Sequence, residues 1–287
     1  MAKEGRFTKD KFGFNQPADA PLYPKPPIYY RNAEVIAIDY ETDEEAALDL
    51  LPEGLELPSP PMASLNLVRY PFSTFGAYEE AILGIMSTWQ GEKRLYIPHI
   101  VLNSDIPQAA GREIWGIPKK MAHITFEKGA DLIWGKMERP EGNRIVTAGV
   151  RPETPVDIKK TTIDAVSACL RIIPSPEEGA EPSLAELVEV YSKFTFVEMW
   201  QGPGWIHYDT VSMIDPWHKL SVQKIVNASY RICHIELGYG KIIKKFWGVF
   251  GKLMFYHGNF FRLPNFLEIG AYHKPKNRVN ERRQAWA

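Results

Sequence analysis

The chain has 287 residues, of which 45% are hydrophobic and 24% are charged, and its formal net charge is −1. That composition supplies enough apolar material for a substantial buried core. It argues against a disordered chain, which combines low hydrophobicity with high net charge, and against a generally basic nucleic-acid-binding protein.

The sequence contains no uncharged apolar stretch of about 18 residues, so we expect no transmembrane helix and no membrane partner. The first residues, MAKEGRFTKDKFGFNQ, lack the apolar segment of a secretory signal. Cys169 and Cys233 are too few for a disulfide framework and are expected to be buried thiols. These features predict a cytoplasmic protein.

Three segments are expected along the chain: an arm, a mainly β domain and a tail. Residues 1–26 are predicted to form an extended arm, because the prolines near its end disfavour a helix. Within residues 27–247, alternating apolar residues predict strands over 33–42, 62–70, 77–86, 94–103, 123–128, 130–138, 143–151, 184–200 and 222–237. Helices are predicted over 43–51, 107–115 and 240–256, a loop over 174–183, and either a strand or a helix over 163–174.

Successive strands joined by short turns favour an antiparallel sheet that closes into a barrel or a sandwich. The alternating strand–helix rhythm of a doubly wound fold is missing. The predicted fold class is therefore mainly β (α+β), with a few short helices.

Residues 248–287 are predicted to form a basic, aromatic C-terminal extension. Residues 238–287 hold ten lysines and arginines, two glutamates and eleven aromatic residues. Such a segment can bind an anionic membrane or a nucleic acid. The favoured interpretation is a helix docked on the barrel with its charges in solvent, so neither partner is predicted.

Several common functional motifs are missing from the sequence. There is no glycine-rich nucleotide-binding loop and no GxSxG nucleophile motif. The seven histidines lack the spacing of a metal site, and His207 with Asp209 is too small a set. No metal and no cofactor are therefore predicted.

The segment that points to chemistry is GREIWGIPKKMAH, residues 111–123. Neighbouring side chains of a strand face opposite ways, so one lysine of the pair can face a cavity while the other faces elsewhere. Burial in an apolar cavity disfavours the charged form of a lysine. A neutral amine attacks carbonyl groups and forms a Schiff base, which acts as an electron sink. A solvated Lys-Lys pair on a turn is the alternative.

GREIWGIPKK resembles the signature of the acetoacetate decarboxylase family, a Gly-Arg-Glu element followed by apolar residues and Pro-Lys-Lys. GAYEEAILGI is similar to the family strand that carries an active-site glutamate, and WQGPGWIHY and PWHKLSVQKIVNASYRI are similar to its C-terminal elements. The resemblance covers roughly residues 27–247 and implies the family's antiparallel β-barrel, or cone. Acetoacetate decarboxylase is itself the established example of a lysine activated by desolvation or by a neighbouring cation.

The resemblance implies three catalytic residues. Lys119 matches the Schiff-base lysine. Lys120 matches its neighbour, which either assists electrostatically or only shapes the turn. Glu80 matches the glutamate that transfers protons.

The resemblance also implies residues that bind the substrate. Tyr78 is expected to share the face of Glu80. Arg112 either holds the lysine loop in an ion pair with Glu113 or contacts the substrate. Trp115, Ile117 and Met121 are either apolar walls around the lysine or ordinary core; of these, Trp115 and Met121 are counted with the substrate-binding residues.

Two positions depart from the family pattern. Ala33 stands where the family has an arginine, and Asn66 stands where it has a second glutamate. Arg31 lies two residues before Ala33, and a spacing of two preserves the face of a strand. Arg31 is therefore a candidate replacement for the arginine, and Asn66 remains a substrate-binding candidate.

The resemblance implies a carbon–carbon lyase that decarboxylates a β-keto acid through a Lys119 iminium. An aldolase-dehydratase that condenses pyruvate with an aldehyde through the same Schiff base is the first alternative. A non-catalytic protein that binds a small carboxylate is the second. The implied partners are a small keto acid, an aldehyde co-substrate for the aldolase, and further copies of the chain in a homo-oligomer built from dimers.

Overall fold

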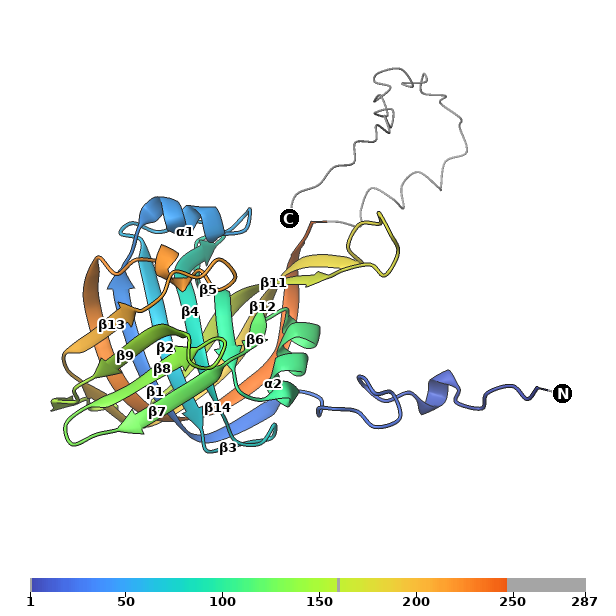
Figure 1. The fold of residues 1–287 in the computed structure, drawn as a ribbon, viewed down its shortest axis with the longest axis horizontal. Coiled ribbons are helices and arrows are strands. Elements are labelled where there is room, and N and C mark those ends of the chain that lie inside the picture. The colour runs from blue at the N-terminus through green and yellow to red at the C-terminus, as the bar shows by residue number, and fades with distance from the viewer. Residues whose placement is uncertain (1, 159–160, 247–287) are drawn as a thin grey trace, which may run out of the picture. The chain divides into compact units, whose positions relative to one another are not determined.

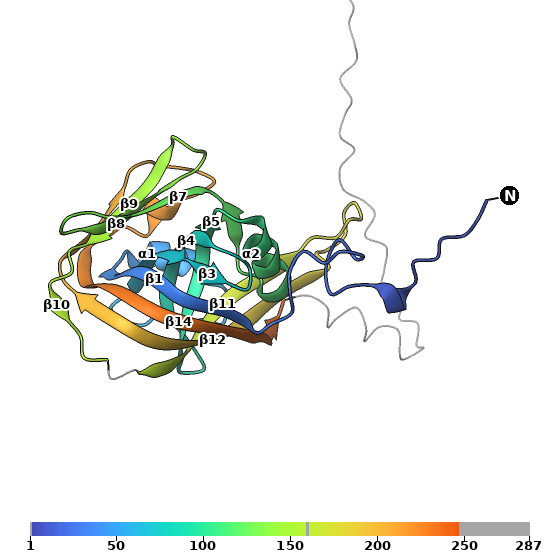
Figure 2. The same cartoon turned by 90° about the horizontal axis from the view of Figure 1, so that it is seen from below.

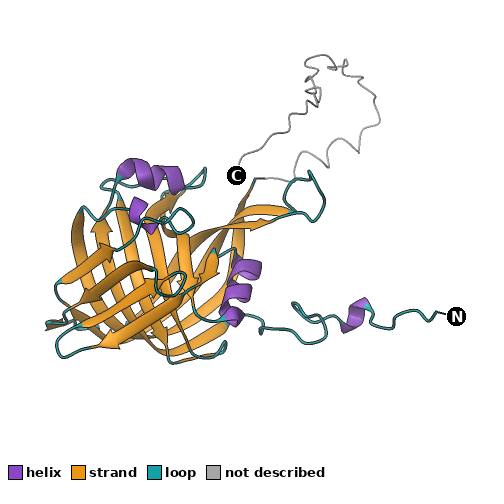
Figure 3. Ribbon diagram, viewed as in Figure 1, coloured by secondary structure: helices purple, strands orange, loops and turns teal. Residues whose placement is uncertain are grey.

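The computed structural model describes residues 2–158 and 161–246, which are rich in strands and poor in helix (Figure 3). The strands are β1 (Ile28–Glu41), β2 (Met62–Tyr70), β3 (Phe72–Ser73), β4 (Tyr78–Trp89), β5 (Glu92–Leu102), β6 (Lys119–Met121), β7 (His123–Lys128), β8 (Ile133–Glu138), β9 (Arg144–Val150), β10 (Thr154–Pro155), β11 (Thr162–Ile173), β12 (Leu184–Gln201), β13 (Gly204–Tyr208) and β14 (Lys224–Lys245). The predicted mainly β fold class is confirmed.

The helical segments are short. They are α1 (Glu44–Leu50), α2 (Asp105–Ala110), a π-helical turn (Gly111–Trp115) that continues α2, and two 3₁₀ turns (Lys9–Lys11 and Trp217–Lys219). The Asp43 side chain caps α1 by accepting a 2.8 Å hydrogen bond from the backbone N–H of Ala46. None of the helices in the described ranges has the length and apolar character needed to cross a membrane.

Seven strands form a closed ring in the order β12–β11–β5–β4–β2–β1–β14, and β14 pairs with β12 to complete it (Figure 1). Neighbouring strands in the ring are antiparallel except β11 and β5, which are parallel. The predicted antiparallel barrel is thus confirmed, with one parallel pair. The short β6 runs parallel to β5 at the side of the ring.

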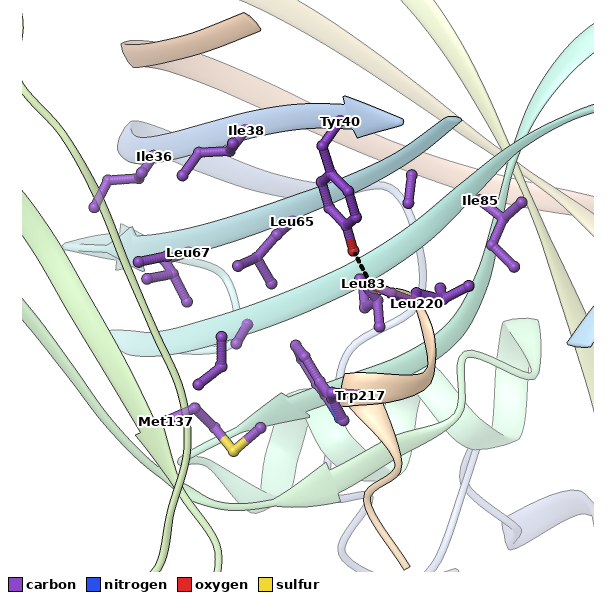
Figure 4. Close-up of a cluster of buried hydrophobic side chains, with 14 of the residues drawn as sticks. Ile36, Ile38, Tyr40, Leu65, Leu67, Leu83, Ile85, Met137, Trp217 and Leu220 are labelled. Atoms are coloured by element: carbon purple, nitrogen blue, oxygen red, sulfur yellow. Dashed lines mark hydrogen bonds between the residues drawn. The ribbon is translucent and has the colours of Figure 1, made fainter. Parts of the chain in front are cut away.

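A second, antiparallel sheet in the order β13–β9–β8–β7 covers the outside of the barrel wall formed by β1, β2 and β4 (Figures 1 and 2). The two layers bury one hydrophobic core between them, which includes Ile36, Leu65 and Leu83 from the wall and Met137 from the second sheet (Figure 4). Residues alternate between the two faces of each strand. Val35 and Ala37 consequently belong to a separate cluster inside the barrel.

One predicted element is wrong and one ambiguity is resolved. Residues 163–174 belong to the strand β11 for nearly their whole length. The helix predicted from residue 240 is contradicted, because β14 continues to Lys245 and pairs with β12 as far as Glu186. Pairing with a long neighbouring strand outweighs the local helical pattern. The rest of that prediction, and all of the predicted 248–287 extension, lies outside the described residues.

A half-buried histidine predicts how the stability of the fold depends on pH. His99 on β5 stacks near Trp217, with 6.3 Å between ring centroids. Burial, assisted by the nearby Lys120 cation, lowers the pKa of His99 from 6.5 to about 4. Its contribution to stability is therefore present above pH 6.5 and is lost as the pH falls through 4, by about 3 kcal/mol.

We expect His99→Gln to flatten this part of the pH profile, because glutamine does not titrate. Urea unfolding at pH 7 and at pH 4.5 measures the effect. An unchanged difference between the two pH values in the variant would contradict the assignment to His99.

Candidate active site

The interior of the barrel holds a cavity of about 340 Å³. Most of its lining is apolar, including Ile97, Ile117, Val190 and Phe194. The polar groups that reach it are few, and they include Lys119, Glu80, Asn66, Arg231 and Asp39. A largely apolar cavity with a few convergent polar groups is the usual form of a small-molecule site.

Lys119 and Glu80 form an ion pair at this cavity. Lys119 Nζ lies 2.7 Å from Glu80 Oε1, and the side chains are only 5% and 4% exposed. Although the contact is close, it is not aligned as a hydrogen bond, and no donor in the described residues makes one to Oε1. The distance of 2.7 Å is within hydrogen-bond reach, so a small reorientation of the lysine amine would let Oε1 accept a proton from it.

The residues of the GREIWG motif position the lysine. A Cβ atom on Gly111 would lie 2.6 Å from Lys119 Cδ, so only glycine leaves room for the lysine side chain. Gly116 adopts a φ of 72°, and a Cβ atom there would lie 2.4 Å from the Cα atom of Arg171. The chain then enters β6, where Lys119 pairs with Ile100 of β5 and points inward.

Three tyrosines surround the ion pair, and two of them were not predicted from the sequence. Tyr70 donates a 3.1 Å hydrogen bond to Glu80 Oε2, and Tyr78 donates a 3.3 Å hydrogen bond to the Tyr30 hydroxyl. The Tyr78 ring centroid lies 5.9 Å from Lys119 Nζ, which is a cation–π distance. Tyr78 thus lies beside the lysine, but unlike Tyr30 and Tyr70 it does not line the cavity, so its predicted contact with the substrate is not supported.

Burial raises the pKa of Tyr70 and Tyr78 well above the ordinary value. The nearby Glu80 charge acts in the same direction on both. Both hydroxyls therefore stay protonated at neutral pH, and Tyr70 can keep its hydrogen bond to the glutamate.

Lys120 does not reach the cavity. Its Nζ lies 3.0 Å from Asp215 Oδ1 and also donates to the backbone oxygen of Ile214. Asp215 is 1% exposed and accepts a second ion pair from Arg139 at 3.0 Å. The alternation of side chains along β6 sends Lys120 away from Lys119, so the predicted catalytic role of Lys120 is not supported.

The contact between Lys120 and Asp215 predicts how Lys120→Met affects stability and chemistry. The variant is expected to lower the free energy of unfolding by about 1–2 kcal/mol, because the buried Asp215 keeps Arg139 but loses one of its two ion-pair partners. Schiff-base formation at Lys119 is expected to remain within a fewfold of wild type. Urea unfolding and borohydride trapping measure the two effects. Loss of trapping in a variant that remains folded would restore a role for Lys120 in the chemistry.

The structure also contradicts the prediction for Arg31. Arg31 is exposed, lies over the Tyr29 ring at 5.8 Å and does not line the cavity. The register of β1 against β14 shifts between Tyr30 and Ala33, and Asn32 has a φ of 53°. This bulge breaks the period of two on which the prediction depended.

Arg112, Trp115 and Met121 do not line the cavity either. Arg112 donates a 3.2 Å hydrogen bond to the backbone oxygen of Lys119 and so holds the lysine strand, while Glu113 accepts a hydrogen bond from the Tyr23 hydroxyl. Trp115 is buried behind the cavity and donates to the backbone oxygen of Gly238 at 3.0 Å. Met121 is 39% exposed. Of the expected apolar walls, Ile117 alone lines the cavity.

Asn66 does line the cavity, where it donates a 3.1 Å hydrogen bond to the Ser64 hydroxyl. Arg231 on β14 was not predicted. Nothing in its strand pattern distinguishes it from a surface arginine, and only the closure of the ring turns it inward.

The described residues hold no cluster of histidine, cysteine, aspartate and glutamate that could bind a metal ion.

Neither cysteine is suited to act as a nucleophile. Cys169 and Cys233 are both buried and free. Burial raises the pKa of each thiol to about 12, so the reactive thiolate is rare at neutral pH. Among the nucleophilic side chains described here, the cavity offers the lysine amine beside a carboxylate.

The sequence and the fold both match known proteins. The family model described as acetoacetate decarboxylase (ADC) matches residues 15–246. The chain is 32% identical over 238 residues to acetoacetate decarboxylase 2 of Mesorhizobium japonicum, and the match covers 80% of this chain and 88% of that protein.

Two solved structures share the fold. The acetoacetate decarboxylase of Legionella pneumophila superposes with a TM-score of 0.75 at 27% identity, covering 86% of this chain and 98% of that chain. The enduracididine biosynthesis enzyme MppR, solved in complex with pyruvate, superposes with a TM-score of 0.69 at 18% identity, covering 83% of this chain and 99% of that one.

Proposed function

The chain belongs to the acetoacetate decarboxylase family, and on that basis we propose that it is a carbon–carbon lyase that forms a Schiff base between Lys119 and a keto acid. The observation that carries the proposal is the buried contact of 2.7 Å between Lys119 Nζ and Glu80 Oε1 at the cavity. An amine beside a carboxylate in a site shielded from water has both groups that imine formation needs.

The first part of the reaction uses both residues. Glu80 takes a proton from the Lys119 ammonium, and the neutral amine attacks the keto carbon. The carbonyl oxygen receives two protons and leaves as water; one is returned by Glu80, and the other comes from the lysine nitrogen, which keeps its third proton in the product. The product is an iminium, in which the lysine nitrogen is doubly bonded to the former keto carbon.

In a β-keto acid, the bond between the carboxylate and the adjacent carbon then breaks. Carbon dioxide leaves, and the electron pair moves into the iminium to give an enamine. A proton is added to the enamine carbon, and water hydrolyses the resulting iminium to a ketone and free Lys119. Tyr70 supports these proton transfers by holding Glu80 at its other oxygen.

Condensation of pyruvate with an aldehyde is the second candidate. It uses the same lysine, but the enamine of pyruvate attacks the aldehyde and the carboxylate stays. Two observations support this second candidate function. The resemblance places Ala33 and Asn66 where the family decarboxylases have two charged residues, and the fold is shared with MppR, whose structure was also solved with the condensation product of pyruvate and imidazole 4-carboxaldehyde.

Product analysis by NMR separates the candidates. The protein is incubated with carbon-13-labelled acetoacetate, or with labelled pyruvate and an aldehyde. Acetone and bicarbonate above the uncatalysed rate support decarboxylation, and a condensed or dehydrated adduct supports the aldolase. If the wild-type protein traps a keto acid on reduction but releases no product with any tested substrate, the remaining candidate is a protein that only binds small carboxylates.

A further inference from the structure

We infer that Arg231 binds the carboxylate of the keto acid and so selects acids over neutral ketones. The inference rests on the proposed Schiff-base function and adds a specificity-determining residue to it. It is carried by the place of Arg231 in the barrel, by its lack of a carboxylate partner and by the small residues beside it.

Arg231 and Glu80 lie on one cross-strand row of the barrel wall. Glu80 pairs with Val68, Val68 pairs with Val35, and Val35 pairs with Arg231. Three strand spacings separate the ends of this row, about 14 Å along the sheet. Because the ring has seven strands, three steps lead to nearly the opposite wall. Both side chains line the one cavity, so a small molecule bound to Lys119 lies between them.

The guanidinium of Arg231 has no carboxylate partner within ion-pair distance in the described residues. Its one hydrogen bond there runs from Nε to the Ser229 hydroxyl at 2.8 Å. The four other half-buried arginines all pair with a carboxylate, namely Arg69, Arg94, Arg139 and Arg171. A partly desolvated cation without an anion is costly, and a bound carboxylate removes that cost.

The charged groups around Arg231 also indicate where the carboxylate lies. Burial lowers the pKa of the guanidinium from its ordinary value and the Asp39 charge opposes that shift, yet an arginine remains protonated at neutral pH. Asp39 lies four residues beyond Val35 on β1, where it pairs with Ser64, and is therefore further from Glu80 than Val35 is. Repulsion from Asp39 therefore disfavours a carboxylate at that end of the guanidinium, whereas on the side toward Lys119 the charge of Glu80 is offset by its ion pair with the lysine.

The neighbouring residues leave space for such a ligand. Ala33 and Ala37 flank Val35 on the inner face of β1, and Ser229 lies two residues before Arg231 on β14. Small side chains at these three positions crowd the guanidinium little, and its two terminal nitrogens make no hydrogen bond among the described residues. Those nitrogens can form the paired hydrogen bonds by which an arginine recognises a carboxylate.

This role predicts a particular kinetic signature. If carbon dioxide leaves, the carboxylate is held in the bound substrate and released in the transition state. Loss of the arginine then weakens binding more than it slows the chemical step. A neutral ketone has no carboxylate, so its reaction with Lys119 is independent of Arg231.

The experiment compares Arg231→Gln with wild type in borohydride trapping, using acetoacetate, pyruvate and the neutral ketone 2-butanone as probes. The concentration that gives half-maximal labelling is expected to rise about 10- to 100-fold for the acids. For 2-butanone it is expected to stay within about twofold, since no charged hydrogen bond to Arg231 is involved. Arg231→Lys keeps the charge but not the paired geometry and is expected to recover part of the loss.

Lys224→Met is the matched control, because Lys224 is an exposed cation on the same strand and pairs with Glu41 at 2.9 Å. Equal losses for acids and 2-butanone in Arg231→Gln, or no loss for the acids, would overturn the inference while leaving the Schiff base intact. If wild type traps neither acids nor 2-butanone, the proposed function fails, and this inference fails with it. Retained trapping of 2-butanone also shows that the variant is folded.

Discussion

Replacing Lys119 by alanine is expected to lower kcat by about 10⁴-fold or more, because it removes the atom that forms the covalent intermediate. Lys119 supplies the one amine at the cavity among the described residues. The assay is the rate of acetone formation from acetoacetate, or of the condensation product if the NMR analysis identifies that reaction. Thermal melting accompanies the assay, because Glu80 loses its buried partner in this variant.

Lys120→Ala is the matched control for this loss. It removes an identical side chain from the next position, but one that contacts Asp215 instead of the cavity. The structure predicts a rate within a few times that of wild type for this control. Comparable losses in the two variants would show that the loss follows the Lys-Lys segment and not the Lys119 amine.

Replacing Glu80 by glutamine is expected to lower kcat by about 10²- to 10⁴-fold, the usual contribution of a positioned acid or base. Glutamine keeps the size of the side chain and can still accept a hydrogen bond from Tyr70, but it cannot take the proton from Lys119. Trapping with borohydride is expected to slow in parallel, because imine formation itself needs the proton transfer.

Glu79→Gln is the matched control. Glu79 lies on the same strand with its side chain on the opposite face, where it pairs with Arg69 at 3.4 Å. We expect this change to leave kcat within a few times wild type. A loss of activity in Glu79→Gln as large as that in Glu80→Gln would point to damage of β4 and would remove the case for proton transfer by Glu80.

Much of the fold could be predicted from the sequence, because the alternation of apolar and polar residues along a strand shows which of them are buried. Strand β2 occupies the predicted residues 62–70, and β7 the predicted residues 123–128. The helix predicted from residue 240 fails for a physical reason. Its apolar spacing fits a helix locally, while residues 240–245 pair with residues of β12 that lie fifty to sixty positions earlier in the chain. Local patterns carry no information about such a partner.

The residues of the candidate site were likewise predicted where a local motif marks them and missed where only the tertiary structure does. Lys119 and Glu80 were predicted because a local motif marks each of them, and the structure brings them together. Tyr70 and Arg231 were missed because only the closed barrel turns them toward the lysine. Arg31 was misplaced by a single bulged residue, Asn32, which no alternation argument anticipates.

The proposed Schiff base is tested most directly by borohydride reduction with intact-mass analysis and peptide mapping, using acetoacetate and pyruvate on wild type and on Lys119→Ala. Wild type is predicted to gain the mass of one reduced imine, located on Lys119, and Lys119→Ala is predicted to gain none. An equal adduct on Lys119→Ala, or no adduct on wild type with any carbonyl compound, would contradict the account.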